Sequence, residues 1–241
     1  YEQTSFKMTK KTKLSEFYHF NKLANEWWSE SGKYKILHKI KPIRIKYILN
    51  HVSSKNIKNL EILDLGCGGG LVCESLAKLG CNVTGIDFVE NNIKAAKLHA
   101  SQNNLKINYY TQDIDDLSLK QKYDLIILFE VLEHIDNWDK TLLKIKKFLK
   151  KGGLIILSTI NRNIVSNILA IKFAENILRW VPKNTHDYNK LITPEELEKV
   201  LIKEDFSILD FSGLIFNPLA REWRLSKEIK LVNYFCTARL N

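Results

Sequence analysis

Between residues 59 and 158 the chain repeats one pattern, in which a short apolar run, a turn and a segment of helical periodicity follow one another. The apolar runs are rich in Leu, Ile and Val, as from Tyr123 to Phe129. Such runs are typical of strands that are buried on both faces. Because helices separate the strands, we expect a parallel sheet with helices on both faces. The predicted strands lie at about 60–65, 82–87, 107–110, 123–129 and 154–158.

Helical periodicity predicts three helices between these strands, at about 71–79, 89–103 and 137–150. Gly152 and Gly153 follow the last of them, as glycines often do at a helix C-terminus. Thr193 and Pro194 suit the first positions of a further helix, which would end near residue 203. Two more strands are predicted at about 206–211 and 231–239. The whole pattern therefore predicts an α/β fold with a mostly parallel seven-stranded sheet.

The segments outside this pattern indicate how the chain is organised. Residues 14–52 read as helical, and a long segment without a predicted strand separates Ser158 from Thr193. We expect a basic helical cover over 1–58 and one main domain over 59–241, with a helical insertion at about 161–190. No linker and no internal repeat divides the 241 residues further.

Charge changes this picture in one respect. The chain carries a net charge of +10, which would ordinarily point to nucleic acid or to an anionic membrane. Basic residues exceed acidic ones by 13 to 4 over residues 1–58, whereas the counts are 12 to 13 over 59–158 and 12 to 10 over 159–241. The excess positive charge therefore belongs to the N-terminal cover. The four cysteines form no CxxC pair, which favours a reducing, cytoplasmic compartment.

A glycine-rich loop joins the first predicted strand to the first helix, with the sequence Asp64-Leu65-Gly66-Cys67-Gly68-Gly69-Gly70. Glycines suit a sharp turn that approaches a ligand closely, and a helix N-terminus favours negative ligand groups. Asp87 ends the second strand, 21 positions after Gly66, where an acid can accept the hydroxyls of a ribose. The loop and this acid predict a nucleoside cofactor, and the alternative is a tight turn with a helix-capping acid.

The spacing of the glycines separates two classes of cofactor. A nicotinamide-binding loop needs a third glycine where Leu71 stands, which disfavours a dehydrogenase. The loop resembles instead that of class I S-adenosylmethionine-dependent methyltransferases, a Rossmann-like fold whose last strand is antiparallel. This resemblance implies that the cofactor is bound by Gly66, Gly68, Asp87, Asp113 and Phe129. Asp113 could equally be a solvated acid, and Phe129 could belong to the core.

Two acids and a histidine follow the fourth predicted strand. If the chain turns helical there, Glu130, Glu133 and His134 share one face, because positions i, i+3 and i+4 are neighbours on a helix. Such an oxygen-rich set predicts a divalent cation, in particular magnesium. A cation would lower the pKa of an acceptor hydroxyl, and Glu133 or His134 could remove its proton. The alternative is a structural or purely acid–base cluster, and the sequence does not divide the ligand and base roles.

Several motifs together resemble the ubiquinone biosynthesis O-methyltransferase family over residues 15–240. They are the glycine loop, Glu130 to His134, Ser158 to Asn163, Trp180 to Asp187, the pair Trp27-Trp28, and the run from His38 to Arg44. The family implies O-methylation of a polyprenyl catechol-type intermediate and of demethylubiquinol, with other ubiquinone biosynthesis enzymes as candidate partners. It also implies that Arg44 contacts the cofactor, although the pattern alone reads Arg44 as a solvated helix residue.

The insertion raises the question of lipid. Residues 164–181 combine a broad apolar face with Lys172 and Arg179, a pattern typical of helices that lie in a membrane interface. An ordinary lid helix over the cofactor is the alternative, but a polyprenyl substrate favours peripheral attachment to the inner face of a membrane. His186 lies beside Asp187 and is a candidate base or a loop-ordering residue.

Two other classes of function stay open at this level. A nucleic-acid methyltransferase would use the basic charge, yet the fourth strand ends in Phe-Glu rather than in the Asn/Asp-Pro-Pro-Tyr associated with methylation of base amino groups. This difference argues against nucleic acid as a partner. A non-catalytic lipid-binding module is the other alternative, and it would not bind the cofactor.

Overall fold

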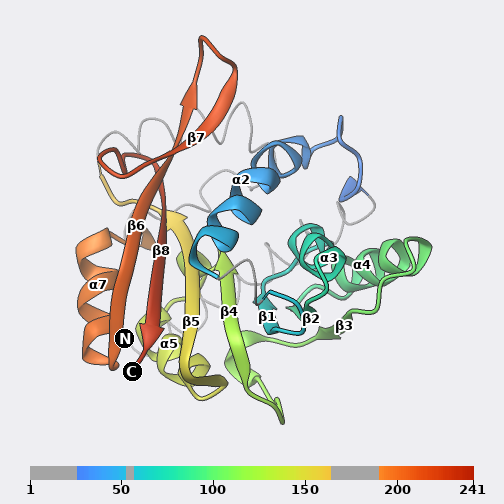
Figure 1. The fold of residues 1–241 in the computed structure, drawn as a ribbon, viewed down its shortest axis with the longest axis horizontal. Coiled ribbons are helices and arrows are strands. Elements are labelled where there is room, and N and C mark those ends of the chain that lie inside the picture. Colours follow the sequence, from blue (N-terminus) through green and yellow to red (C-terminus); the bar gives the residue numbers. More distant parts are fainter. Residues whose placement is uncertain (1–25, 53–56, 164–189) are drawn as a thin grey trace, which may run out of the picture.

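A single mixed sheet runs through the part of the chain that the computed structural model describes, residues 26–52, 57–163 and 190–241 (Figure 1). Eight strands pair within these residues in the order β3-β2-β1-β4-β5-β8-β6-β7. The first five strands along the chain are parallel, and β8 is antiparallel to both β5 and β6. The strands are β1 Glu61–Leu65, β2 Asn82–Asp87, β3 Asn108–Thr111, β4 Tyr123–Phe129, β5 Leu149–Ile160, β6 Phe206–Asn217, β7 Glu222–Ser226 and β8 Asn233–Leu240.

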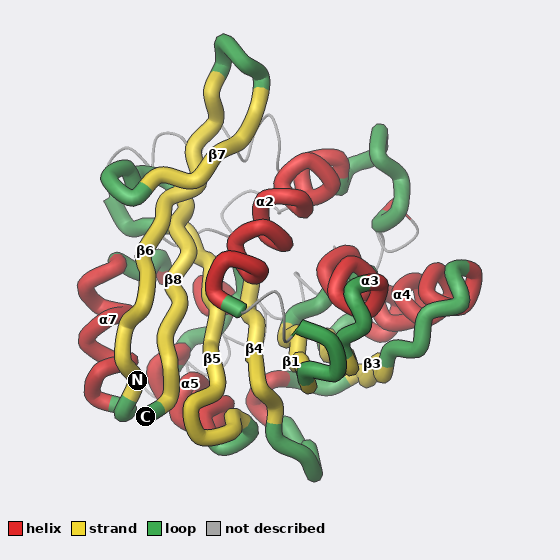
Figure 2. Tube along the Cα trace, viewed as in Figure 1, coloured by secondary structure: helices red, strands yellow, loops and turns green. Residues whose placement is uncertain are grey.

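Helices cover both faces of the sheet (Figure 2). On one face α2 (Lys35–His51), α3 (Leu71–Lys78) and α4 (Glu90–Gln102) bury apolar side chains in one core cluster. On the other face α5 (Trp138–Lys146) and α7 (Pro194–Lys203) bury theirs in a second cluster. Neighbouring residues of β4 point into different clusters, because side chains alternate along a strand. This double burial explains why the strands read as continuous apolar runs.

The predicted α/β fold with its largely parallel sheet is confirmed, but three boundaries differ. The helix predicted to reach residue 150 ends at Lys146, and β5 begins at Leu149. Pairing with β4 explains the difference, since Leu149 lies opposite Tyr123 and the Lys150 ammonium binds Asp124 at 2.9 Å. The helical prediction for 14–52 holds for α2, whereas residues 26–34 form turns.

The prediction of seven strands was wrong, because β6 and β7 form a hairpin that the sequence pattern did not indicate. β6 extends to Asn217 rather than ending near 211, and β7 returns along it with Phe216 opposite Trp223. Pro218 and the charged residues beside it give the turn the composition of a loop. In Figure 2 this hairpin projects beyond the rest of the sheet.

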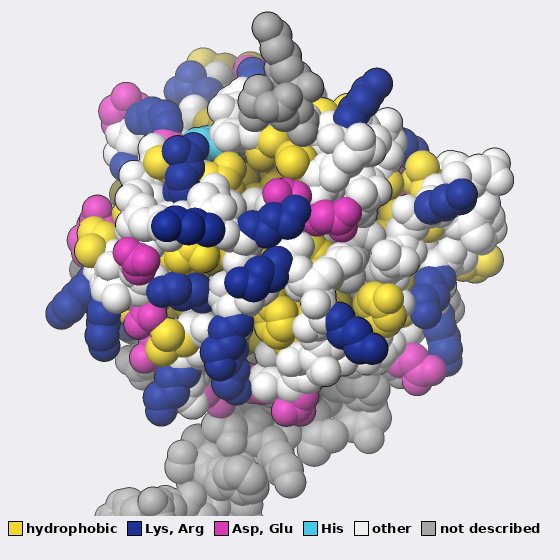
Figure 3. Space-filling view, turned by 60° about the horizontal axis from the view of Figure 1, so that its bottom comes forward, with side chains coloured by type: hydrophobic (Ala, Val, Ile, Leu, Met, Phe, Trp, Pro, Cys, Tyr) yellow, Lys and Arg dark blue, Asp and Glu magenta, His cyan; other side chains and the backbone are white. Residues whose placement is uncertain are grey.

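Charged side chains of both signs are mixed on the surface, and the cysteines are buried. Lys and Arg side chains are spread over the face shown in Figure 3, with acidic and apolar side chains between them rather than one continuous basic patch. No helix among the described residues is long and apolar enough to cross a bilayer. The four cysteines are buried and unpaired.

Candidate active site

The glycine loop lies where predicted, between the end of β1 and the start of α3. Gly66, Gly68 and Gly70 have positive φ angles of 73°, 54° and 86°, which only glycine adopts readily. Their Cα atoms are also closely covered by protein. A Cβ at Gly66 would collide with the Val131 side chain, and one at Gly68 would collide with the ring of Trp27. The glycines therefore serve the packing of this chain as well as any ligand.

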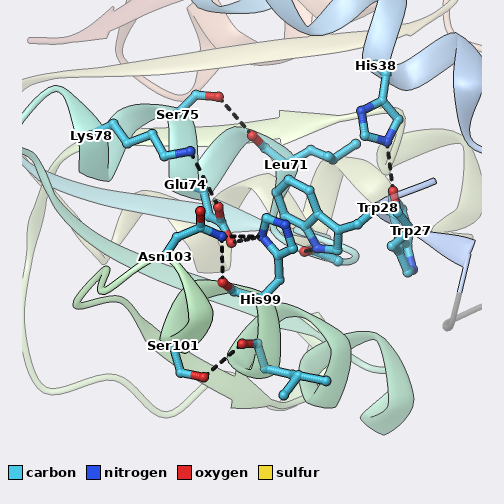
Figure 4. Close-up of polar contacts among 12 residues, drawn as sticks. Trp27, Trp28, His38, Leu71, Glu74, Ser75, Lys78, His99, Ser101 and Asn103 are labelled. Atoms are coloured by element: carbon cyan, nitrogen blue, oxygen red, sulfur yellow. Dashed lines mark hydrogen bonds and ion pairs between the residues drawn. The ribbon is translucent and has the colours of Figure 1, made fainter. Parts of the chain in front are cut away.

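Two adjacent tryptophans hold the segment before α2 on this loop (Figure 4). The Trp28 indole donates a hydrogen bond to the carbonyl of Gly69 at 3.0 Å. Its ring stacks on His99 of α4 with the centroids 3.4 Å apart, and His99 in turn bonds to Glu74 of α3 at 2.7 Å. Sequence reasoning used these tryptophans only as marks of a family, and nothing in their spacing indicated this contact.

Asp87 ties the loop to the second strand. Its carboxylate accepts hydrogen bonds from the backbone N–H groups of Gly68 at 2.9 Å and Val89 at 2.8 Å, and from the Asn92 amide at 3.2 Å. Asn92 accepts in turn from the Trp27 indole at 2.8 Å. Burial raises the pKa of Asp87, and these hydrogen bonds oppose that rise. Since a carboxylate has about four acceptor sites, Asp87 has room for one further donor in this arrangement.

A cavity of about 590 Å³ opens above the carboxyl ends of the parallel strands. That edge is where open α/β sheets bind their ligands. All six residues predicted to bind the cofactor line it, namely Arg44, Gly66, Gly68, Asp87, Asp113 and Phe129.

Asp113 and Phe129 border the cavity and also make contacts within the protein. Asp113 borders the cavity and also accepts a hydrogen bond from the backbone N–H of Asp115 at 3.0 Å, which caps a short 3-10 helix. Phe129 borders the cavity and packs edge-on against Phe235, with the centroids 5.6 Å apart.

Arg44 is the main cation of the cavity wall. It is 6% exposed, and its guanidinium forms an ion pair with Glu130 and lies 5.0 Å from the centroid of the Phe129 ring. Burial lowers the pKa of Arg44 to about 10, although the nearby Asp64 and Glu133 carboxylates oppose this. The pattern-based view of Arg44 as a solvated residue was wrong, because α2 crosses the end of β4 and turns this position inward.

The chain does not turn helical at Glu130, directly after β4. Its φ angle is 53°, a left-handed conformation that separates the strand from a 3-10 turn at Leu132–His134. Besides the ion pair, its carboxylate accepts hydrogen bonds from Ser158 at 2.8 Å and Asn233 at 2.7 Å. Four elements thus meet at this side chain, and the predicted helical face with Glu133 and His134 does not form.

Glu133 and His134 both border the same cavity. The Glu133 side chain is 4% exposed and accepts a hydrogen bond from the Thr159 hydroxyl at 2.8 Å. Burial raises the pKa of Glu133, while the charge of His134 opposes the rise. A carboxylate with a raised pKa is better suited to take up a proton near neutral pH.

Asp64, near the end of β1, is a further buried acid of the cavity wall. Burial raises its pKa to about 7, and hydrogen bonding from Cys73, at 3.1 Å, and the charge of Arg44 oppose the rise. The wall of the cavity therefore carries several acids around one buried cation.

The predicted cation site does not fit this arrangement. Within residues 26–52, 57–163 and 190–241, no three His, Cys, Asp or Glu side chains gather in a way that could hold a metal ion. Glu130 is engaged by Arg44, Ser158 and Asn233, and Glu133 is bonded to Thr159. Both acids are bonded to protein groups, whereas the prediction made them ligands of a metal ion.

One predicted site residue lies outside the described part of the chain, and two residues at the site were not predicted. His186, the remaining candidate base, falls outside the described residues. Asn233 and Thr159 were missed as partners of the two acids. Thr159 belongs to the Ser158–Asn163 run that marks the family, whereas no signal in the sequence pointed to Asn233 at the start of β8.

Solved structures with the same fold are methyltransferases. The magnesium protoporphyrin IX methyltransferase of Synechocystis, solved with bound SAH, matches with a TM-score of 0.65 at 19% identity, covering 87% of this chain and 86% of that one. The N-methyltransferase NodS of Bradyrhizobium japonicum, also with SAH, matches at 0.62 and 15% identity, covering 94% and 98%. A family profile for methyltransferase domains matches residues 37–210. The fold and the loop thus define a class I S-adenosylmethionine-dependent methyltransferase.

Curated relatives narrow the class to one family. The ubiquinone biosynthesis O-methyltransferase of Rickettsia felis is 43% identical over 223 residues, with 91% of each chain covered. The protein of the same name from Bartonella tribocorum is 42% identical over 235 residues, covering 93% of this chain and 95% of the relative. The chain belongs to the ubiquinone biosynthesis O-methyltransferase family.

Proposed function

We propose that this protein methylates hydroxyl groups on polyprenylated rings of ubiquinone biosynthesis, one on a catechol-type intermediate and one on demethylubiquinol. One observation carries the proposal. The glycine loop, Asp87, the Glu133–His134 pair and the Arg44–Glu130 ion pair all line one cavity. A methyl donor and a proton acceptor can therefore serve the same ring.

The residues at the loop end fit S-adenosylmethionine. Gly66 and Gly68 present backbone without side chains, Asp87 has room for one more donor, and Asp113 borders the same space. S-adenosylmethionine supplies a methyl group on a sulfonium sulfur, which an oxygen lone pair of the acceptor must attack. Arg44 contributes positive charge near the bound carboxylate of the cofactor in this proposal, as a guanidinium suits that group.

The Glu133–His134 pair would take the proton from the acceptor hydroxyl. A phenol has a pKa near 10, so it is mostly protonated at neutral pH and its oxygen needs a base. The raised pKa of Glu133 brings its proton affinity closer to that of the phenol. Thr159 fixes the orientation of the Glu133 carboxylate, and His134 carries the second proton-binding group of the pair. His186 stays a further candidate base.

Turnover by the purified protein tests this function. S-adenosylmethionine and a catechol with a short polyprenyl tail should give a singly methylated product, measured by mass spectrometry. Glu133→Gln should lower kcat about 10²- to 10⁴-fold, the range for removal of a general base. Glu90→Gln changes an exposed carboxylate of α4 and should leave turnover unchanged. Equal rates for Glu133→Gln and the wild type would remove Glu133 from the reaction.

A divalent cation at Glu130, Glu133 and His134 stays a prediction that the same assay decides. Because these acids have other partners in the described structure, no step above depends on a metal. A cation role requires that product formation stop with EDTA and return with magnesium. Turnover that EDTA does not change would refute it.

We also propose that the protein attaches peripherally to the inner face of an anionic membrane. The support is the basic charge of residues 1–58 and the apolar, basic pattern of residues 164–181, which lie outside the described residues. In this proposal the basic cover over residues 1–58 and the basic side of the insertion at about 161–190 face the anionic lipid.

A further inference from the structure

The cavity has two chemically different ends. At the glycine loop, buried polar side chains such as Asp64, Asp87 and Asn92 stand among apolar ones such as Trp27 and Leu71. The other end is lined by aliphatic and aromatic side chains of the C-terminal strands and of the segment between β7 and β8. This second region, the apolar end, consists of Leu214, Phe216, Trp223, Ile229 and Leu231.

The apolar end begins beside the Arg44–Glu130 ion pair. Leu214 of β6 lies opposite Asn233 of β8 in the sheet. Asn233 donates the 2.7 Å hydrogen bond to Glu130, whose carboxylate pairs with Arg44. A ring held between the loop and Glu133 would therefore direct a substituent on its far side toward Leu214 and the hairpin.

Close backbone packing fixes the shape of this end. The carbonyl of Ile229 lies over Gly213 of β6 so tightly that any side chain at Gly213 would collide with it. This contact holds the segment after β7 against β6 and keeps Ile229 and Leu231 at the cavity wall. Across the hairpin, the centroids of the Phe216 ring on β6 and the Trp223 ring on β7 lie 5.2 Å apart.

The same side chains are partly open to the surroundings. Phe216 and Leu231 are each 49% exposed and Ile229 is 42% exposed. Covering exposed hydrocarbon with an apolar ligand removes it from water, which favours binding. Because these residues both line the cavity and reach the surface, an apolar chain longer than the cavity can lie along them and continue outside.

We propose that the apolar end binds the first isoprene units of the substrate's tail. The inference rests on the proposed function, since it assigns a place to the tail of that substrate. It also explains the hairpin, because β6 and β7 extend the sheet at the point where the tail would leave the ring. The apolar end offers only hydrocarbon contacts to the tail, so the site should accept tails of different length.

Two substrates separate tail binding from methyl transfer. One is a catechol with a three-isoprene tail, and the other is the same catechol with a methyl group in place of the tail. The test variants are Phe216→Asp and Leu231→Asp, which place a charge at half-exposed positions that can hold it without unfolding. Ile202→Asp is the matched control, because Ile202 is 57% exposed on α7 and is not part of the cavity lining.

Each test variant should lower kcat/KM for the tailed catechol at least about tenfold, mainly through KM, and should change kcat/KM for the tail-free catechol much less. Equilibrium binding of the tailed catechol without S-adenosylmethionine should weaken in parallel. Ile202→Asp should match the wild type with both substrates. Circular dichroism and the thermal midpoint of unfolding show whether each variant is folded.

The outcomes distinguish the two proposals. A parallel loss for both substrates, or no loss for either, would overturn the tail site while leaving the methyltransferase function in place. Binding of the tailed and tail-free catechols with equal affinity by the wild type would overturn it as well. If the wild type methylates neither catechol, the proposed function itself fails, and the tail site fails with it.

Discussion

At the residue scale, the glycine loop owes its composition to two demands. Sequence reasoning explained the glycines by a ligand that approaches the backbone closely. The structure adds a second reason, because Trp27 covers Gly68 and Val131 covers Gly66. A glycine in such a motif can therefore be required by a neighbouring side chain as well as by a cofactor.

Gly68→Ala should destabilise the protein and weaken cofactor binding. The alanine needs a positive φ, which costs about 1–2 kcal/mol, and its methyl group must also displace the Trp27 ring. Gly152→Ala is the matched control, since Gly152 has a φ of 73° and no atom lies within 4 Å of the place that its new methyl group would take. Urea unfolding and calorimetric titration with S-adenosylmethionine measure both effects. Equal unfolding free energies for the two variants would show that Trp27 yields without cost.

For the acids after β4, the sequence predicted the location but not the arrangement. Sequence placed Glu130, Glu133 and His134 at a strand end, and all three border the cavity. Their common helical face depended on an ordinary backbone at Glu130, and the left-handed conformation there removes it. A single unfavourable φ is set by the packing of β4, β5 and β8 around the residue, which the local sequence does not reveal.

At the element scale, α7 begins as its sequence predicts. The Thr193 hydroxyl accepts from the backbone N–H of Glu196 at 3.2 Å, and the Glu196 carboxylate accepts from the backbone N–H of Thr193 at 3.0 Å. Thr193→Ala removes the first of these bonds and should lower the free energy of unfolding by about 1 kcal/mol. Ser118→Ala, at an exposed loop position, serves as the control in urea unfolding. A loss below about 0.3 kcal/mol would mean that the cap contributes little to this helix.

Elements were predictable where their own residues decide the conformation. The parallel strands follow from buried apolar runs, and α7 follows from its capping residues. Elements that depend on pairing with another strand were not predictable from the sequence. β5 gains its first residues from pairing with β4, and β7 exists because β6 offers an edge to a segment that contains Pro218 and several charges.

At the scale of the whole molecule, the basic cover and the apolar cavity end suit a substrate drawn from a membrane. Sedimentation with anionic liposomes measures attachment directly. The double change Ile168→Asp and Leu169→Asp places two charges in the apolar sequence of residues 164–181. If this sequence binds lipid, as proposed, the change should reduce the bound fraction severalfold, because charged groups are costly to place among lipid tails. Asp at the exposed Ile202 of α7 is the control. An unchanged bound fraction for the double variant would contradict attachment through this segment.

The positions of two indole rings have a spectroscopic consequence. Trp27 lies against the glycine loop and Trp223 lies at the hairpin, so each borders a different end of one cavity. Fluorescence of Trp27 should respond to the nucleoside, and fluorescence of Trp223 should respond to the hydrocarbon chain. Because Trp28, Trp138 and Trp180 also fluoresce, each response is assigned by the change that is lost when Trp27 or Trp223 alone is replaced by Phe. The protein thus carries its own pair of optical probes, through which the order of arrival of its two substrates can be followed without any label.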